Sequence, residues 1–542
     1  MKLNLTLAAI ALLFLSLHAA PVLAQEPADN AQSQSSQPAP AKPGEAKPVE
    51  QKANASESSD KEQSSVTQHT ARIGGQNISY TATASTTLLK NDKGDPEALL
   101  FSTAYTLNGV KDFSQRPIIF LYNGGPGSAS IWLHIGAWGP RRLVVDNAAP
   151  IPGPPYQLVD NQYSLLDKAD LVFIDPVGTG FSHAVGKAKD SDFWSVKSDV
   201  ESLAQFISIY ISRNHRWNSP KLLYGESYGT FRSVALCQYL QDHDGIYING
   251  IGLQSSVLDL GTLNFTTGDD RSYILYLPTY AAVAWHYNLI KNRPADLPAF
   301  LDQVRQFAST QYTDALMKGS DISDSEKQQV AAKMSAYTGL DENYLIKANL
   351  RVNLPQFRAE LLRSRGVTIG RYDARYNAAT YDVLEEYAAS DPSYNAVVGA
   401  FTAAFNAYMR DELKFGEGMT YKVLPMEPSE HWKWTSATAN QEGFPSAPNV
   451  EDDLVRELLD NAYLQVQVEN GYFDLATPFY ATEFTMNHLL LPKSASDRIH
   501  LEYYDAGHMI YLHEPDLAKL ATNVRAFIAQ VSQRRSVASG RQ

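Results

Sequence analysis

The sequence predicts an α/β fold in which helices cover both faces of a mainly parallel central sheet. Short apolar runs typical of buried strands alternate with segments of helical period, as at 169–175 followed by 195–212. Between 259 and 440 strand signals are few and helical segments follow one another. This second observation predicts a helical insertion above the carboxyl edge of the sheet, where a lid would exclude water from a ligand.

The chain has 542 residues, which is too many for one compact core. Residues 1–24 are typical of a secretory signal peptide, because Lys2 precedes an apolar run and small residues end it. Residues 25–68 have almost no large apolar side chains and predict a disordered linker. The remaining divisions are a first core part at 69–258, the helical insertion or lid at 259–440, a second core part at 441–531 and a flexible tail at 532–542.

Composition excludes several classes of function. A net charge of −13 without a long basic run disfavours nucleic-acid binding. Cys237 is the 1 cysteine of the chain, so neither an intrachain disulfide nor a cysteine metal cluster is possible. No metal and no cofactor is expected, and no segment after the signal peptide is long and apolar enough for a membrane span. We therefore expect a secreted or periplasmic protein, and the sequence leaves its oligomeric state open.

A strand-to-helix turn carries the most informative motif. The apolar run 221–224 leads into Gly225-Glu226-Ser227-Tyr228-Gly229, and a helical pattern follows. Strand, sharp turn and helix are the context in which Gly-x-Ser-x-Gly forms a nucleophile elbow. The alternative is an ordinary glycine-rich turn, and the motif alone does not decide between the two.

Further polar residues follow other predicted strands. The loop from Asn123 to Ser128 follows 117–122, Asp474 follows 463–471, and His508 follows 499–504. The chain order Ser227, Asp474, His508 is the one expected of the α/β-hydrolase architecture. Asp505 is an alternative acid and His513 an alternative base, but their positions in the chain suit these roles less well.

These residue types fit nucleophilic catalysis. Ser227 needs a base to take its proton, and His508 can do so near neutral pH. Asp474 would accept the other imidazole N–H and stabilise the charged ring. Backbone N–H groups of Tyr228 and of the Gly124–Gly125 loop would hold the developing oxyanion.

The sequence resembles the serine carboxypeptidases of the α/β-hydrolase superfamily, as found in secreted bacterial members. The resemblance rests on the motifs at 123–127, 175–182, 225–229 and 505–509. It implies a triad of Ser227, Asp474 and His508, and oxyanion-hole amides from Gly125 and Tyr228. It also implies that Asn123, Gly124 and Glu226 grip the C-terminal carboxylate of a peptide.

The sequence departs from the family pattern at Ala137, where the resemblance predicts a glutamate that pairs with Glu226. An unpaired and ionised Glu226 would repel a substrate carboxylate. A guanidinium from Arg141 or Arg142 could offset that repulsion. We therefore expect a less acidic pH optimum than the family's usual one.

The resulting hypothesis is a secreted serine-type peptidase that releases C-terminal residues from peptides through an acyl-enzyme on Ser227. An esterase or acyltransferase with the same triad is the alternative within enzymes. A catalytically silent ligand-binding protein is the alternative from another class. The side chains that fill the specificity pocket are expected to come from the insertion.

Overall fold

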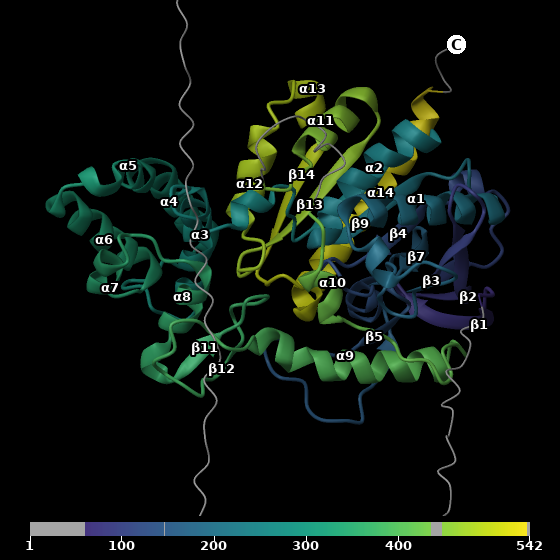
Figure 1. Ribbon diagram of the computed structural model, residues 1–542, viewed down its shortest axis with the longest axis horizontal. Helices are drawn as coiled ribbons and strands as arrows, with labels where there is room; N and C mark the ends of the chain where they lie inside the picture. The colour runs from purple at the N-terminus through teal and green to yellow at the C-terminus, as the bar shows by residue number, and fades with distance from the viewer. Residues whose placement is uncertain (1–59, 146, 435–446, 539–542) are drawn as a thin grey trace, which may run out of the picture. The chain divides into compact units, whose positions relative to one another are not determined.

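The computed structural model describes residues 60–145, 147–434 and 447–538. Within these ranges the main sheet is 10-stranded and runs in the order β1-β2-β3-β7-β4-β9-β10-β13-β14, with β8 paired to β3 (Figure 1). The bounds are β1 (Ser64–Ile73), β2 (Gln76–Lys90), β3 (Pro96–Leu107), β4 (Ile118–Tyr122), β7 (Asp170–Ile174), β8 (His183–Ala184), β9 (Lys221–Glu226), β10 (Gly250–Gln254), β13 (Gln465–Gly471) and β14 (Ile499–Tyr504).

The sheet is antiparallel at its start and parallel in the rest. Strands β1, β2 and β3 pair antiparallel, and β3 pairs antiparallel with β7. From β7 through β4, β9, β10 and β13 to β14 each neighbouring pair is parallel. The predicted mainly parallel sheet is confirmed, and the carboxyl ends of its parallel strands meet at one edge. A separate small hairpin joins β5 (Arg141–Leu143) to β6 (Leu158–Asp160).

Apolar side chains on both faces of the sheet explain the two helix layers. In β4, Ile119 and Leu121 pack in one apolar cluster with α14, whereas Ile118 and Phe120 pack in a second cluster with α1 and α2. A strand buried on both faces has a continuous apolar sequence, which is the pattern of β4, β7 and β9. The helices of the core are α1 (Val196–Arg213), α2 (Tyr228–Asp244), α11 (Glu451–Asp460), α12 (Phe479–His488), α13 (Lys493–Ser496) and α14 (Glu514–Ala538).

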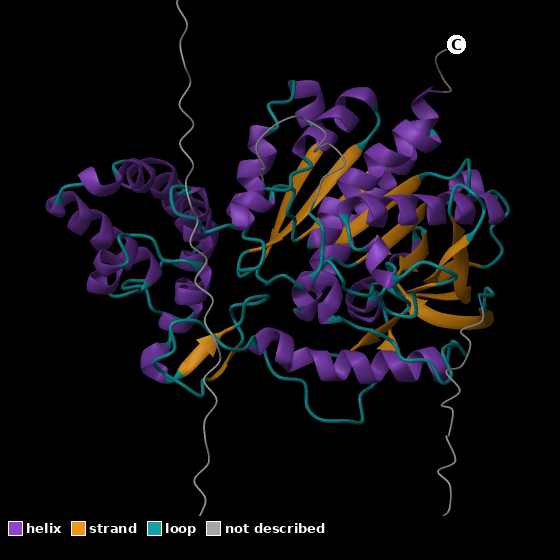
Figure 2. Ribbon diagram, viewed as in Figure 1, coloured by secondary structure: helices purple, strands orange, loops and turns teal. Residues whose placement is uncertain are grey.

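The segment predicted as a helical insertion is mostly helical where the structure describes it (Figure 2). Residues 435–440 of that segment lie outside the described ranges. Its elements are α3 (Arg271–His286), α4 (Leu297–Phe307), α5 (Thr313–Met317), α6 (Asp324–Thr338), α7 (Glu342–Lys347), α8 (Leu354–Glu360), β11 (Val367–Ile369), β12 (Asn377–Ala379), α9 (Pro392–Asp411) and α10 (Met426–Glu430).

The helices of the insertion pack in two separate apolar clusters, whereas the sequence predicts the insertion as one unit. Helices α3 to α8 form a cluster of their own that also takes in Phe473 and Phe479 from the core. Helix α9 instead places Val397, Phe401 and Phe405 in the cluster of the sheet and α14. Helical period predicts an apolar stripe but not which surface the stripe will cover.

Part of each segment that the sequence predicts to be flexible belongs to a regular element in the structure. The predicted linker extends to 68, yet β1 begins at Ser64 and pairs along its length with β2. Within 64–68 no side chain is buried, so hydrogen bonds to β2 rather than apolar burial order this part of the edge strand. The predicted tail begins at 532, yet α14 continues to Ala538. The signal peptide and the linker up to 59 lie outside the described residues.

None of the helices in the described ranges is long and apolar enough to cross a membrane. The same ranges hold no cluster of three or more His, Cys, Asp or Glu side chains suited to a metal ion.

Glu469 on β13 makes the stability of the fold depend on pH. The side chain is fully buried, and Tyr504 Oη donates a 2.6 Å hydrogen bond to its Oε2. Burial raises the pKa of Glu469 to about 8, against an opposing effect of that hydrogen bond. The folded protein therefore keeps a proton that the unfolded chain loses near pH 4.5, so stability falls as pH rises from there towards 8.

We expect Glu469→Gln to flatten this decline, because the amide cannot ionise. The check is the urea midpoint of unfolding measured between pH 4.5 and 8. The control is Glu417→Gln, which changes an exposed carboxylate and should leave the slope as in the wild type. An unchanged slope in Glu469→Gln would contradict the assignment.

Candidate active site

The turn between β9 and α2 holds Ser227 at the carboxyl edge of the sheet. Ser227 has φ 63° and ψ −131°, a strained conformation for a residue with a Cβ. A Cβ added to Gly225 would overlap the carbonyl oxygen of Gly229, so the close approach of strand and helix requires glycine here. Ser227 N donates to Gln254 O of β10 at 3.0 Å, which fixes the turn to the sheet.

The glycine-rich loop after β4 lies directly against this elbow. A Cβ added to Gly124 would lie 2.4 Å from the backbone nitrogen of Tyr228. Gly125 has φ +104°, which favours glycine. Asn123 is fully buried, and its Oδ1 accepts a 3.1 Å hydrogen bond from Leu133 N. The loop and the elbow thus form one surface.

The loops after β13 and β14 bring an acid and a base together. Asp474 Oδ2 lies 2.8 Å from His508 Nδ1, and both side chains are buried. Asp474 Oδ1 accepts from the backbone nitrogens of Ala476 and Thr477 at 2.8 and 3.0 Å. Thr477 Oγ1 donates to Asp474 Oδ2 at 2.7 Å. These bonds hold the carboxylate in the position that orients the imidazole.

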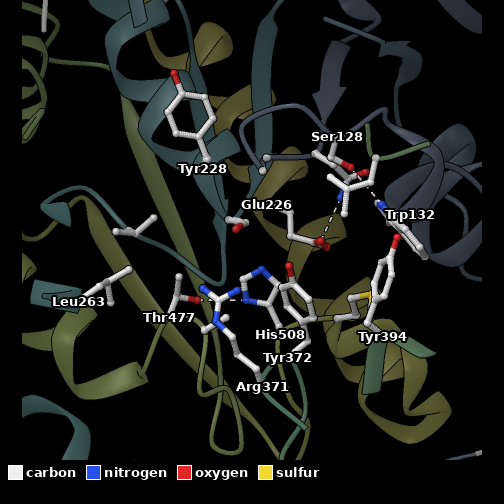
Figure 3. A pocket seen from close by; sticks show the side chains of 18 of the residues that line it. Ser128, Trp132, Glu226, Tyr228, Leu263, Arg371, Tyr372, Tyr394, Thr477 and His508 are labelled. Atoms are coloured by element: carbon white, nitrogen blue, oxygen red, sulfur yellow. Dashed lines mark hydrogen bonds between the residues drawn. The ribbon is translucent and has the colours of Figure 1, made fainter. Parts of the chain in front are cut away.

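A cavity of about 210 Å³ joins the elbow, the glycine-rich loop and the base. Ser227 and His508 both line it, and Figure 3 shows the His508 ring between Glu226 and Thr477. Asp474, which hydrogen-bonds to His508, is not among the lining residues. Apolar and aromatic side chains make up most of the remaining wall. They are Trp132, Tyr228, Val257, Leu260, Leu263, Tyr372, Tyr394, Leu424, Trp434 and Met509.

Comparison with known protein families finds a match over most of the chain. The family described as serine carboxypeptidase matches residues 95–511. The chain belongs to the serine carboxypeptidase family.

Relatives of this family member are similar over parts of their length. Serine carboxypeptidase-like 45 of Arabidopsis thaliana is 27% identical over 28% of this chain and 32% of its own. Retinoid-inducible serine carboxypeptidase of Homo sapiens is 30% identical over 23% of this chain and 25% of its own. The chain thus matches a third or less of the length of these two relatives.

A solved structure shows the same fold. Kex1(delta)p, a prohormone-processing carboxypeptidase from Saccharomyces cerevisiae, superposes with a TM-score of 0.52 at 17% identity. The match covers 84% of this chain and 92% of that one. The predicted α/β-hydrolase fold of this serine carboxypeptidase family member is confirmed.

Electrostatics at His508 favour its charged form. Burial by itself lowers the pKa of His508, but the Asp474 carboxylate and its hydrogen bond outweigh burial, so the pKa lies above 6.5. Glu226 raises the pKa further, whereas Arg371 lowers it.

Glu226 is a buried carboxyl in the wall of the cavity. Asn123 Nδ2 donates to its Oε1 at 2.9 Å, and Gln254 Nε2 donates to its Oε2 at 2.8 Å. Burial raises the pKa of Glu226 to about 7, against the opposing effects of His508, Tyr511 and Asn123. Below that pH the group is mainly protonated and adds no negative charge to the cavity.

Arg141 and Arg142 do not reach the cavity, contrary to the role suggested from the sequence. Arg141 pairs with Asp160 at 2.8 Å and with Glu412 at 3.2 Å. Arg142 pairs with Glu514 at 3.1 Å. They follow Ala137 closely in the chain, but the short hairpin of β5 and β6 holds Arg141 and Arg142 away from the elbow.

The rival acid and base lie elsewhere. His513 Nδ1 lies 2.7 Å from Asp516 Oδ2, at the start of α14. Asp505 is exposed, lies outside the cavity wall, and its backbone oxygen accepts from Arg375 Nη1 at 2.6 Å. The structure thus places Asp474 and His508, rather than their rivals, in contact.

Sequence reasoning missed several residues of the cavity wall, most notably Arg371, Tyr372 and Trp132. Arg371 and Tyr372 come from the loop between β11 and β12, which carries no motif. Thr477 was also missed. A local signal for it exists, because a threonine three residues after an aspartate can donate a hydrogen bond to the carboxylate, as Thr477 does to Asp474. The expectation that insertion residues line the pocket is met by Arg371, Tyr372, Tyr394, Leu424 and Trp434.

Proposed function

We propose that this protein is a serine hydrolase that acts as a carboxypeptidase, with Ser227 as nucleophile, His508 as base and Asp474 as the residue that orients the base. The observation that carries the proposal is the buried 2.8 Å contact between Asp474 and His508 behind a cavity that Ser227 also lines.

The mechanism follows from the roles of these groups. His508 takes the proton of Ser227 as Oγ attacks the peptide carbonyl carbon, and the N–H groups of Gly125 and Tyr228 hold the oxyanion. The C–N bond then breaks, and the leaving amine takes the proton from His508. A water molecule then attacks the acyl carbon while His508 takes its proton. Return of that proton to Ser227 Oγ releases the shortened peptide and restores the serine.

Recognition of a chain end is supported by the groups beside the nucleophile. Asn123, Gly124 and Glu226 border the cavity next to Ser227. A protonated Glu226 can donate a hydrogen bond to a carboxylate, whereas an ionised one would repel it. The aromatic and aliphatic wall favours substrates with large apolar side chains on either side of the cleaved bond.

Export is also part of the proposal. Residues 1–24 have the charged start, apolar middle and small-residue end of a signal peptide, as expected for a secreted or periplasmic bacterial protein. Expression of the full chain in a bacterial host, followed by N-terminal sequencing of the periplasmic fraction, should find Gln25 at the start. A chain retained in the cytoplasm with its first 24 residues would contradict export.

The triad is tested with a blocked dipeptide that carries a free C-terminal carboxylate. Ser227→Ala and Asp474→Asn should each lower kcat/KM by roughly 10³-fold or more, because the triad acts as a unit. Asp505→Asn and His513→Gln are the matched controls and should stay within about 3-fold of the wild type. Turnover of a simple ester without any peptide cleavage would favour the esterase alternative instead. Absence of both turnover and labelling of Ser227 by an organophosphate would favour a catalytically silent binding protein.

The pH profile tests Glu226. His508 must be neutral to act as a base, so kcat/KM should rise with pH through its elevated pKa. For the free-acid substrate it should fall again as Glu226 ionises near pH 7, which places the maximum close to neutrality. Glu226→Gln should remove the alkaline fall.

The control for this profile is Glu457→Gln. Glu457 is also buried, with its pKa raised to about 7 by burial, but it contacts Cys237 and not the cavity. Its substitution should leave the profile unchanged. A maximum well below pH 5, where His508 is charged, would contradict this account.

A further inference from the structure

The end of β10 carries none of the proposed catalytic residues, yet it lies between two of the strands that do. In the sheet, β10 is the parallel neighbour of β9, which leads to Ser227, and of β13, which leads to Asp474. Gln254, the last residue of β10, accepts the 3.0 Å hydrogen bond from Ser227 N that fixes the elbow. Ser255 follows Gln254, and its contacts extend to the base and towards the acid.

The backbone of Ser255 is in a conformation that serine rarely adopts. Its φ is 52°, in the left-handed region that residues with a Cβ seldom enter. The residue is only 1% exposed, and Ser255 N donates to Glu469 O of β13 at 2.8 Å. Burial and this hydrogen bond hold the strained conformation. Strain of this kind is concentrated at functional sites, so we asked what the side chain contacts.

The hydroxyl of Ser255 binds the main chain of the base. Ser255 Oγ donates a 2.7 Å hydrogen bond to the carbonyl oxygen of His508. His508 N donates in turn to Tyr372 O at 2.6 Å, in the loop between β11 and β12, residues 370–376. Both backbone polar groups of His508 are therefore held, one by the core and one by the insertion. These two bonds fix the main chain from which the imidazole projects.

The carbonyl oxygen of Ser255 reaches the same pair through Thr477. It lies 3.0 Å from Thr477 Oγ1, the hydroxyl that donates to Asp474 Oδ2 and lies 3.2 Å from His508 Nδ1. A hydroxyl carries one proton, so Ser255 O offers that proton a second acceptor beside the carboxylate. Ser255 thus contacts the base directly and the acid through a single side chain.

We propose that Ser255 is a positioning residue that holds His508 in hydrogen-bonding distance of Asp474 and in reach of Ser227. This inference rests on the proposed function. Ser255 lies outside the cavity wall, so it acts on the reaction through His508 and not by contact with a substrate. One bond to the main chain matters because a displacement of about 1 Å at a catalytic group can cost about 100-fold in rate.

The next residue in the chain provides a matched comparison. Ser256 is also buried, at 4% exposed, but its Oγ has no hydrogen-bond partner among the residues that the structure describes. Its carbonyl oxygen accepts from Thr482 Oγ1 of α12 at 3.1 Å, and it too lies outside the cavity wall. Removal of the Ser256 hydroxyl therefore deletes one buried oxygen without removing a bond to His508.

The first experiment compares Ser255→Ala with Ser256→Ala in peptide hydrolysis. Loss of the bond to His508 should lower kcat by roughly 10-fold in Ser255→Ala, with KM within about 3-fold, because a misplaced base slows the chemical step and leaves substrate binding in place. Ser256→Ala should keep both constants within about 3-fold. Ser255→Cys retains a weak donor of similar size and should recover part of the loss.

The pH profile separates positioning from a purely structural effect. Burial lowers the pKa of His508, whereas the Asp474 carboxylate raises it above 6.5, with a further rise from Glu226 and an opposing effect of Arg371. A ring that moves away from Asp474 loses the largest of the raising effects. The rise of kcat/KM with pH, which reports the base, should therefore move to lower pH in Ser255→Ala and stay in place in the Ser256 variant.

A rise that stays at the wild-type pH in Ser255→Ala would overturn the proposal whatever happens to kcat, because a smaller folded fraction lowers the rate without moving the profile. Equal losses of kcat in the variants of Ser255 and Ser256 would also overturn it. The urea midpoint shows whether each variant is folded. Ser255→Gly replaces Ser255→Ala if the latter does not fold, since glycine adopts this φ without strain and also lacks the hydroxyl.

A measurement without substrate separates this proposal from the proposed function. NMR titration of the protein with labelled histidine gives the pKa of His508, whose resonance is identified by its loss in His508→Gln. A lower pKa in Ser255→Ala than in the wild type supports positioning even if the wild type cleaves no peptide. Equal pKa values in the two proteins overturn the positioning role and leave the hydrolase proposal to its own test.

Discussion

The hydrogen bond between Asp474 and His508 is the interaction on which the candidate site depends. It exists because β13 and β14 are parallel neighbours, so the loops that follow them leave the same edge of the sheet. Both side chains are buried, and in such a place a hydrogen bond is stronger than in water while an unpaired carboxylate is costly. The hydrogen bonds of Thr477 to Asp474 therefore stabilise the buried Asp474–His508 pair.

The insertion contacts the Asp474–His508 pair and the sheet directly. The β11–β12 loop accepts the His508 N–H through Tyr372, and α9 packs in the same apolar cluster as the sheet. A change in the insertion would consequently reach His508 directly, through this hydrogen bond and through packing. The same contacts place Arg371 and Tyr372 in the cavity wall.

Local sequence patterns predicted much of the fold, and the features that they did not predict have physical causes. Alternation of buried strands with helices predicted the parallel sheet, because strands covered on both faces need continuous apolar runs. Residues 64–68 of the edge strand β1 were assigned to the linker because pairing with β2 orders a polar sequence that buries no side chain there. The packing of α9 on the sheet escaped it because an apolar stripe does not name its partner surface.

The sequence by itself determined the residues at the strand ends: the glycine-flanked Ser227, the loop at Asn123, and Asp474 and His508 in order. Each is marked locally, since a tight turn or a strand terminus restricts the residues that fit there. Only the tertiary structure decided that Arg141 and Arg142 lie away from the cavity while Arg371 enters it. Residues far apart in the chain meet through non-local packing, so spacing along the sequence does not show which charged side chain will line the cavity with Ser227.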